Sequence, residues 1–171
     1  GVPRIAVHAF LDGRDTPPLS TLEYIARLQQ EMDAVGNCVI GTVQGRYYAM
    51  DRSKNYGLTD IAYACLVGAE GRAAASAVEA VQESYDKDQT PDKTPMVDEY
   101  IPPYVIAEYA GMKDGDSVMH VNYRQDRAIQ LTQAFVCDDY KGERKARPRL
   151  TYLGFTRYWD EFNDYLLGAM G

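Results

Sequence analysis

Apolar runs alternate along this chain with segments of helical periodicity, and this alternation predicts its secondary structure. The runs at 4–11, 38–43, 116–123 and 150–156 are rich in β-branched and aromatic residues and end at turn-forming residues. We therefore expect each of these runs to form a strand. Pro17 and Pro18, which follow the first run, cannot continue a strand.

Helical patterns fill the intervals between the predicted strands. Leu22, Ile25, Leu28, Met32 and Val35 recur at helical spacing after Ser20 and Glu23, a capping-box pair, and Gly36 is placed to end that helix. A second helix is expected from Thr59 or Asp60 to about Val67. A third should follow the capping pair Ser76 and Glu79, and a fourth should cover residues 128–136.

Strands that alternate with helices predict an α/β domain of three layers, α/β/α, with a mostly parallel but mixed sheet. The first strand–helix–strand unit should be parallel and right-handed. Between Lys87 and Tyr104 the chain is polar and proline-rich, which is typical of an ordered excursion over the surface. The strands between Pro95 and Ile106 stay undetermined.

Length and composition indicate one soluble globular domain over 1–171. The chain is 46% hydrophobic and 25% charged, as in ordinary globular proteins. A net charge of −7 argues against a general nucleic-acid binder, and no apolar run has the length of a membrane span. No secretion signal is evident either. Because the chain starts without Met and almost directly in a strand, we expect a fragment of a longer protein.

The cysteines and histidines give no sign of a metal or disulfide site. Cys38, Cys65 and Cys137 lie far apart in apolar segments, as expected of reduced thiols in the cytoplasm. His8 and His120 lie inside predicted strands and are expected in the core. Asp12 and Asp15 are close in sequence, but the neighbouring arginine makes them poor ligands for a cation.

Three predicted strands end in loops that combine arginine with aspartate. These loops contain Arg14 and Asp15, then Arg46, Asp51 and Arg52, then Arg124, Asp126 and Arg127. Because the carboxyl ends of parallel strands meet at one edge of a sheet, the loops should form a common site. Arginine grips phosphate and carboxylate bidentately, and Arg127 also opens a helix whose free N–H groups favour anions. For any single loop, a structural ion pair is the alternative.

The motifs "HAFLDGRDTPP", "GRYYAMDR" and "NYRQDRAIQ", in this order, resemble those of the cofactor-independent (2,3-bisphosphoglycerate-independent) phosphoglycerate mutases. The resemblance covers nearly the whole chain, with Tyr123 where the family usually has Phe. It corresponds to the inserted phosphotransferase, or substrate-binding, domain of that two-domain enzyme. It therefore implies a domain of a glycolytic isomerase that interconverts 2- and 3-phosphoglycerate.

The resemblance also implies roles for individual residues. Asp15 would bind the free hydroxyl of the substrate and act as its general base or acid. The carboxylate and phosphate of the substrate would be held by Arg14, Arg46, Arg52, Arg124 and Arg127. The family's serine nucleophile, its two manganese ions and its "GGVHSH" motif belong to parts absent from this sequence. The chain alone is therefore expected to be inactive, without a cofactor, monomeric, and without nucleic-acid or membrane partners.

Two alternatives remain open at this point. One is the anion-binding domain of a related metal-dependent phosphomutase, such as a phosphopentomutase-like enzyme with a different substrate. The other is a phosphate-sensing module that regulates a partner. A phosphate sensor has no need of a carboxylate beside the bound hydroxyl, so Asp15 favours the mutase.

Overall fold

A computed structural model describes residues 1–162 and 167–170 of the chain. Its strands are β1 (Ile5–Leu11), β2 (Cys38–Gly45), β3 (Arg72–Ala74), β4 (Tyr104–Ile106), β5 (Ser117–His120), β6 (Thr151–Thr156) and β7 (Leu167–Met170). Its helices are α1 (Thr21–Val35), α2 (Arg46–Ala49), α3 (Tyr56–Gly68), α4 (Ala77–Lys87) and α5 (Gln125–Val136), with short 3₁₀ turns η1 (Asp98–Tyr100) and η2 (Asp160–Phe162).

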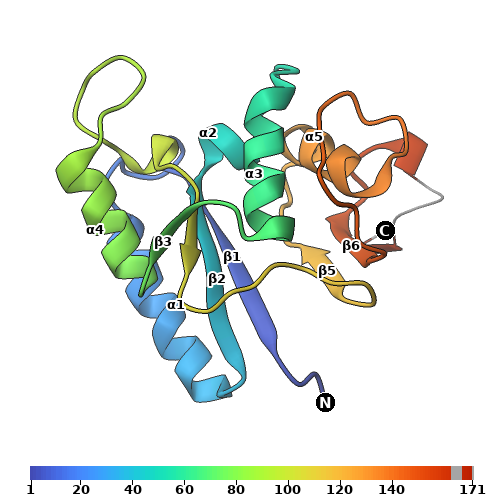
Figure 1. The fold of residues 1–171 in the computed structure, drawn as a ribbon, viewed down its shortest axis with the longest axis horizontal. Coiled ribbons are helices and arrows are strands. Elements are labelled where there is room, and N and C mark those ends of the chain that lie inside the picture. Colours follow the sequence, from blue (N-terminus) through green and yellow to red (C-terminus); the bar gives the residue numbers. More distant parts are fainter. Residues whose placement is uncertain (163–166, 171) are drawn as a thin grey trace.

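The strands form two sheets rather than one. The first has the order β1-β2-β4-β3, in which only the β2–β4 pair is antiparallel, and the second has the parallel order β5-β6-β7. Helices α1 and α4 cover one face of the first sheet and α3 lies over the other (Figure 1). This confirms the layered α/β class with mostly parallel strands. The division into two sheets was not predicted, because strand order depends on contacts that no local pattern records.

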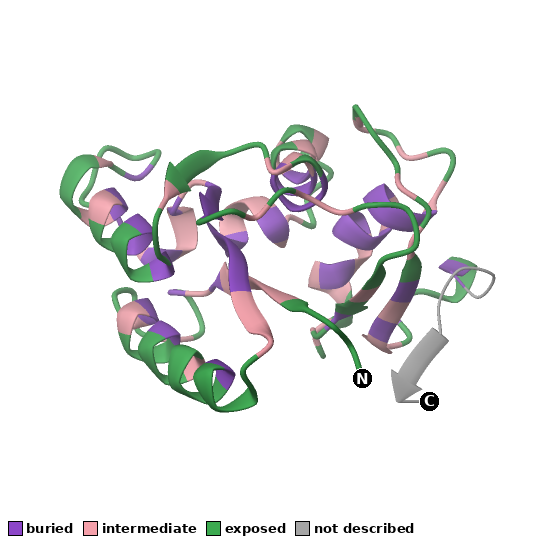
Figure 2. Ribbon diagram, turned by 60° about the horizontal axis from the view of Figure 1, so that its bottom comes forward, coloured by how far each residue is buried: buried purple, intermediate pink, exposed green. Residues whose placement is uncertain are grey.

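Two apolar clusters stabilise these layers. One joins α1 and α4 to the first sheet through residues such as Ile25, Val43 and Val81, and the other joins α3 and α5 to β6 through Leu66, Leu131 and others. Helices α1 and α4 are therefore buried along one side and exposed along the other (Figure 2). The described residues contain no helix that is both long and apolar enough to cross a membrane.

The helix ends follow the sequence signals in part. Gly36 ends α1 in the left-handed conformation, with φ of +86°, and Ser76 accepts a bond from the Glu79 amide at the start of α4, as predicted. At the start of α1, however, the Ser20 side chain makes no capping bond. Buried Asp98 accepts bonds from the Ser20 and Thr21 amides instead, both at 3.0 Å. Helix α5 begins three residues before the predicted start, and α3 begins three or four residues before it.

The second half of the proline-rich segment is buried, so its prediction as a surface excursion was wrong there. Asp98 and Ile101 have no exposed surface, and Ile101 O accepts a bond from the Gly45 amide at 2.8 Å. A side chain at Gly13 or Gly45 would overlap the backbone or side chain of Asp98 and Glu99. These glycines let η1 lie directly against the ends of β1 and β2.

Candidate functional site

The three arginine loops meet, and Asp15 lies at their centre. Its Oδ2 atom accepts a bond from Arg46 Nη1 at 2.8 Å and another from Arg124 Nη1 at 2.8 Å. Arg46 also donates to Asp12. Arg46 follows β2 directly, whereas Arg124 immediately precedes α5. One carboxylate therefore joins loops that lie far apart in the sequence.

Asp126 extends this chain of ion pairs to Arg52. It pairs with Arg52, and its Oδ1 accepts a bond from Arg124 Nε at 3.3 Å. Arg127 Nη1 donates to the backbone oxygen of Met50 at 3.1 Å. Arg46, Arg52 and Arg124 thus pair with Asp15 or Asp126, and the bond to Met50 places Arg127 beside them. The loops come together as predicted, but not at the edge of one sheet, because the third loop follows β5, which belongs to the second sheet.

Arg14 lies at the rim of this cluster rather than within it. Its side chain is 59% exposed and pairs with Glu99 at 3.2 Å. Glu99 was not predicted as part of the site, because it comes from η1 and not from the end of a strand. In the sequence, the glycines that follow the first two predicted strands, Gly13 and Gly45, are the local signal that another segment, here η1, approaches closely.

The arginines keep the aspartates ionised. The hydrogen bond from Arg46, followed by the charges of Arg46, Arg124 and Arg14, holds the pKa of Asp15 below its ordinary value. Burial opposes ionisation of Asp12, but the bond from Arg46 and two backbone amides outweigh burial and lower its pKa as well. The pKa of Arg127 is lowered by burial and then by the charges of the neighbouring arginines. Arg127 therefore lies in a local excess of positive charge.

Some guanidinium N–H groups of the cluster have no hydrogen-bond partner among the described residues. Within the described residues, Arg46 Nε and Nη2 and Arg127 Nε are buried without a partner. Asp15 and Arg124, by contrast, are 58% and 38% exposed and form the open side of the site. Four of the five arginines pair with Asp12, Asp15, Asp126 or Glu99, whereas Arg127 has no paired carboxylate within the described residues. The arrangement suits a small anion that replaces an aspartate or glutamate side chain as the hydrogen-bond acceptor of these arginines.

The same carboxylates do not suit a metal ion. In the part of the chain that the structure describes, no three His, Cys, Asp or Glu side chains are grouped to hold one. Asp12 and Asp15 both accept bonds from Arg46, whose charge would repel a cation. No chemical step in this site can therefore be assigned to a metal held by these residues.

His120 and Cys65 are buried in the core, as predicted, whereas His8 is only partly buried. Burial lowers the pKa of both His8 and His120 to about 4, so both rings are neutral at neutral pH. Their Nδ1 atoms bond to Thr42 Oγ1 and to the Tyr152 hydroxyl, each at 2.9 Å. Burial raises the pKa of Cys65 to about 12, which rules out a reactive thiolate at neutral pH.

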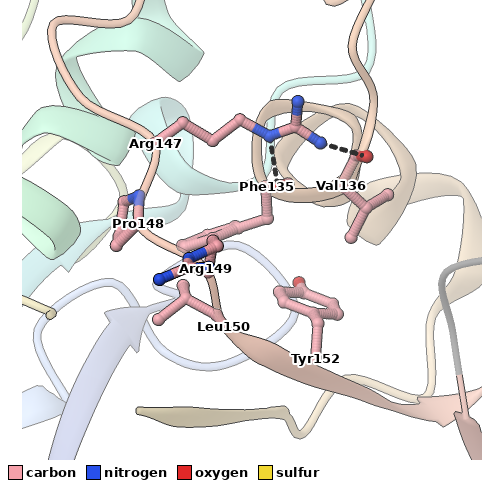
Figure 3. A pocket seen from close by; sticks show the side chains of 7 residues that line it. All are labelled: Phe135, Val136, Arg147, Pro148, Arg149, Leu150 and Tyr152. Carbon is pink, nitrogen blue, oxygen red and sulfur yellow. Dashed lines mark hydrogen bonds between the residues drawn. The ribbon is translucent and has the colours of Figure 1, made fainter. Parts of the chain in front are cut away.

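A separate cavity of about 340 Å³ lies between the end of α5 and the start of β6 (Figure 3). Arg147 lines it, but its Nε and Nη2 atoms donate to the backbone oxygens of Phe135 and Val136 at 3.4 and 2.7 Å. These bonds satisfy carbonyl groups at the end of the helix. The guanidinium group of Arg147 is therefore already bonded to the helix, unlike those of Arg46 and Arg127 in the arginine cluster.

Known proteins resemble this chain over almost its whole length. The family described as BPG-independent PGAM N-terminus matches residues 1–160. The 2,3-bisphosphoglycerate-independent phosphoglycerate mutases of Clostridium perfringens and Clostridium kluyveri are 40% and 43% identical over 162 residues, which is 92% of this chain and 30% of each relative. The corresponding mutase 1 of Methanosarcina acetivorans is 41% identical over 170 residues, 95% of this chain and 32% of the relative.

A solved structure agrees with these relatives. The phosphoglycerate mutase of Leishmania mexicana, in a crystal structure at low cobalt concentration, superposes with a TM-score of 0.86 at 29% sequence identity. The match covers 96% of this chain and 31% of the other. This chain thus spans about 30% of the length of the curated relatives it matches.

Proposed function

Because this chain belongs to the family of 2,3-bisphosphoglycerate-independent phosphoglycerate mutases, we propose that it is the substrate-orienting domain of such an enzyme. The complete enzyme would interconvert 2-phosphoglycerate and 3-phosphoglycerate in glycolysis. The domain would occupy residues 1–171 and would be inactive by itself. The observation that carries the proposal is the position of Asp15, which bonds Arg46 and Arg124 from two separate loops.

The arginines supply the binding chemistry. Phosphoglycerate carries a phosphate and a carboxylate, and five guanidinium groups can bind both ends through charge-assisted hydrogen bonds. The groups we assign to this role are Arg14, Arg46, Arg52, Arg124 and Arg127. Among the described residues, two of them, Arg46 and Arg127, have buried donors without a partner, which supports their availability to a ligand. Binding both ends fixes the orientation of the glycerate between them.

Asp15 supplies a proton acceptor beside the bound substrate. Its lowered pKa keeps it ionised at neutral pH, and its exposure leaves it accessible to the free hydroxyl of the glycerate. As a carboxylate it accepts the hydroxyl proton and can later return it, which is general base and general acid catalysis. Asp12 stays bound to Arg46 and serves to orient that arginine.

The rest of the chemistry is assigned to other parts of a longer polypeptide. The family resemblance implies a serine nucleophile and two manganese ions, and we assign both to those parts. Met119, Val121 and Tyr123 are 52%, 69% and 82% exposed immediately before Arg124. This exposed apolar surface supports the proposal that another part of the enzyme packs over it, next to the site. The complete enzyme is further proposed to be a cytoplasmic monomer.

An NMR titration of the chain with 3-phosphoglycerate tests the proposal. Shifts should concentrate at 13–15, 45–52 and 122–127, and the affinity should fall as salt rises. Glycerate and inorganic phosphate, which each carry one of the two anionic groups, should bind more weakly. Inorganic phosphate that bound as tightly as 3-phosphoglycerate would favour a phosphate sensor. Mutase turnover by the purified chain, with manganese added, would contradict the two-domain assignment.

A further inference from the structure

A buried side-chain amide on α5 holds the loop that carries Arg52. Gln130, on α5, is only 5% exposed. Its Nε2 donates to Asp51 Oδ2 at 2.8 Å and to Thr59 Oγ1 at 2.7 Å, and its Oε1 accepts from the Lys54 amide at 3.0 Å. Both hydrogens of the amide nitrogen are used, and the oxygen is used as well. Only a group that both donates and accepts can occupy this position.

Asp51 connects Gln130 to the loop backbone, because its carboxylate accepts bonds from both. Besides Gln130, it accepts bonds from the Ser53 amide and hydroxyl, at 3.2 and 2.7 Å, and from the Asn55 amide at 3.0 Å. Lys54 has a φ of +63°, in the left-handed region that a side chain disfavours. The loop therefore adopts a tight conformation that depends on these bonds.

Arg52 depends on this loop because its own side chain is weakly held. It is 50% exposed and pairs with Asp126 on the first turn of α5. Arg127, on the same helix, donates to the backbone oxygen of Met50 at the start of the loop. Residues 50–55 and the first half of α5 thus form one unit, which we call the clamp.

We propose that Gln130 is a positioning residue that holds Arg52 in the anion site by fixing the clamp. The proposal rests on the function proposed above, because it requires Arg52 to bind the ligand. Gln130 itself does not touch the ligand, since it acts through Asp51 and the Lys54 amide. Its contribution to affinity should therefore disappear when the Arg52 side chain is absent.

The variant Gln130→Glu tests this with nearly the same shape. An ionised carboxylate cannot donate to Asp51 or Thr59, and it places a second negative charge against Asp51. Gln133→Glu is the matched control. It introduces the same charge one turn further along α5, at a partly exposed residue with no side-chain hydrogen bond among the described residues.

The experiment is a double-mutant cycle on the 171-residue chain, with the Kd for 3-phosphoglycerate as the readout. Arg52→Ala and Gln130→Glu should each weaken binding about tenfold, the effect of one lost charged hydrogen bond. The double variant should bind no more weakly than Arg52→Ala alone. Gln133→Glu should bind like the parent chain. At lower pH the affinity of Gln130→Glu should recover relative to the parent, because the protonated carboxyl can again donate to Asp51.

The outcomes separate the two proposals. If Arg52→Ala binds like the parent chain, the function assigned to Arg52 is wrong, and the positioning role fails with it. If Arg52→Ala weakens binding but Gln130→Glu does not, or if the two losses multiply in the double variant, only the positioning role is overturned. Should Gln130→Glu fail to fold, Gln130→Met removes the same bonds without a charge, and the same cycle decides with that variant.

Discussion

Asp15 competes with the proposed ligand for the same guanidinium groups, because it already binds Arg46 and Arg124. Asp15→Asn removes one negative charge while keeping an acceptor oxygen. Inorganic phosphate should then bind the chain several-fold more tightly, since the local excess of positive charge rises. In the complete enzyme, kcat should fall about 10²-fold or more, because an amide cannot take the hydroxyl proton. A kcat close to that of the parent enzyme would reduce Asp15 to a structural partner of the arginines.

Arg14 and Arg46 differ in burial, and their removal should differ in its effect on stability. Arg14 is mostly exposed and has one ion pair, so Arg14→Ala should change the free energy of unfolding by about 0.5 kcal/mol or less. Arg46 is 3% exposed and pairs with two aspartates, so Arg46→Ala should cost about 2 kcal/mol. Urea denaturation measures both values. Equal losses would mean that the burial of Arg46 adds nothing to stability.

The contact between η1 and the end of β2 can be tested at Gly45. A methyl group there would overlap the backbone oxygen of Glu99, so Gly45→Ala must move η1 and draw Glu99 away from Arg14. We expect a loss of about 2 kcal/mol in urea denaturation. Gly57→Ala is the control, because its methyl group would meet no atom closer than 3.8 Å within α3, where alanine favours the helix. A neutral Gly45→Ala would contradict the close packing of η1.

Elements governed by neighbouring residues were predictable from the sequence, and elements governed by distant contacts were not. The stop at Gly36 and the cap at Ser76 are local, and both were predicted. The cap of α1 is Asp98, 77 residues beyond Thr21, and no local pattern records that pairing. The same distinction holds in the candidate site, where the arginine loops follow from strand ends but Glu99 arrives on η1.

The distribution of charge over the whole molecule sets what the site can bind. The chain carries a net charge of −7, while Arg127 lies among the charges of other arginines and has no paired carboxylate within the described residues. The site is thus a local exception on an acidic molecule, and an anion must approach it against the overall field. Close charge-assisted contacts, rather than long-range attraction, must therefore supply the affinity.

The stability of the whole molecule should fall on acidification, because buried His120 and partly buried His8 are held in their neutral form. Above pH 6.5 the rings of His8 and His120 are neutral in both the folded and the unfolded chain, so stability is complete there. Their folded pKa is about 4, so between pH 6.5 and 4 the unfolded chain binds protons that the folded chain cannot, and stability falls with pH. Each histidine should contribute about 3 kcal/mol to the complete loss, of which about 2 kcal/mol falls between pH 7 and pH 5.

Urea denaturation at pH 7 and at pH 5 measures this loss, and His120→Gln isolates the share of the more deeply buried ring. The variant is expected to be less stable at pH 7, since its bond to Tyr152 changes, but its stability should depend less on pH. The aspartates of the arginine cluster do not interfere, because their lowered pKa values confine their titration to more acidic solutions. If the parent chain were equally stable at pH 7 and pH 5, both rings would have to accept a proton in the folded state, which their burial opposes.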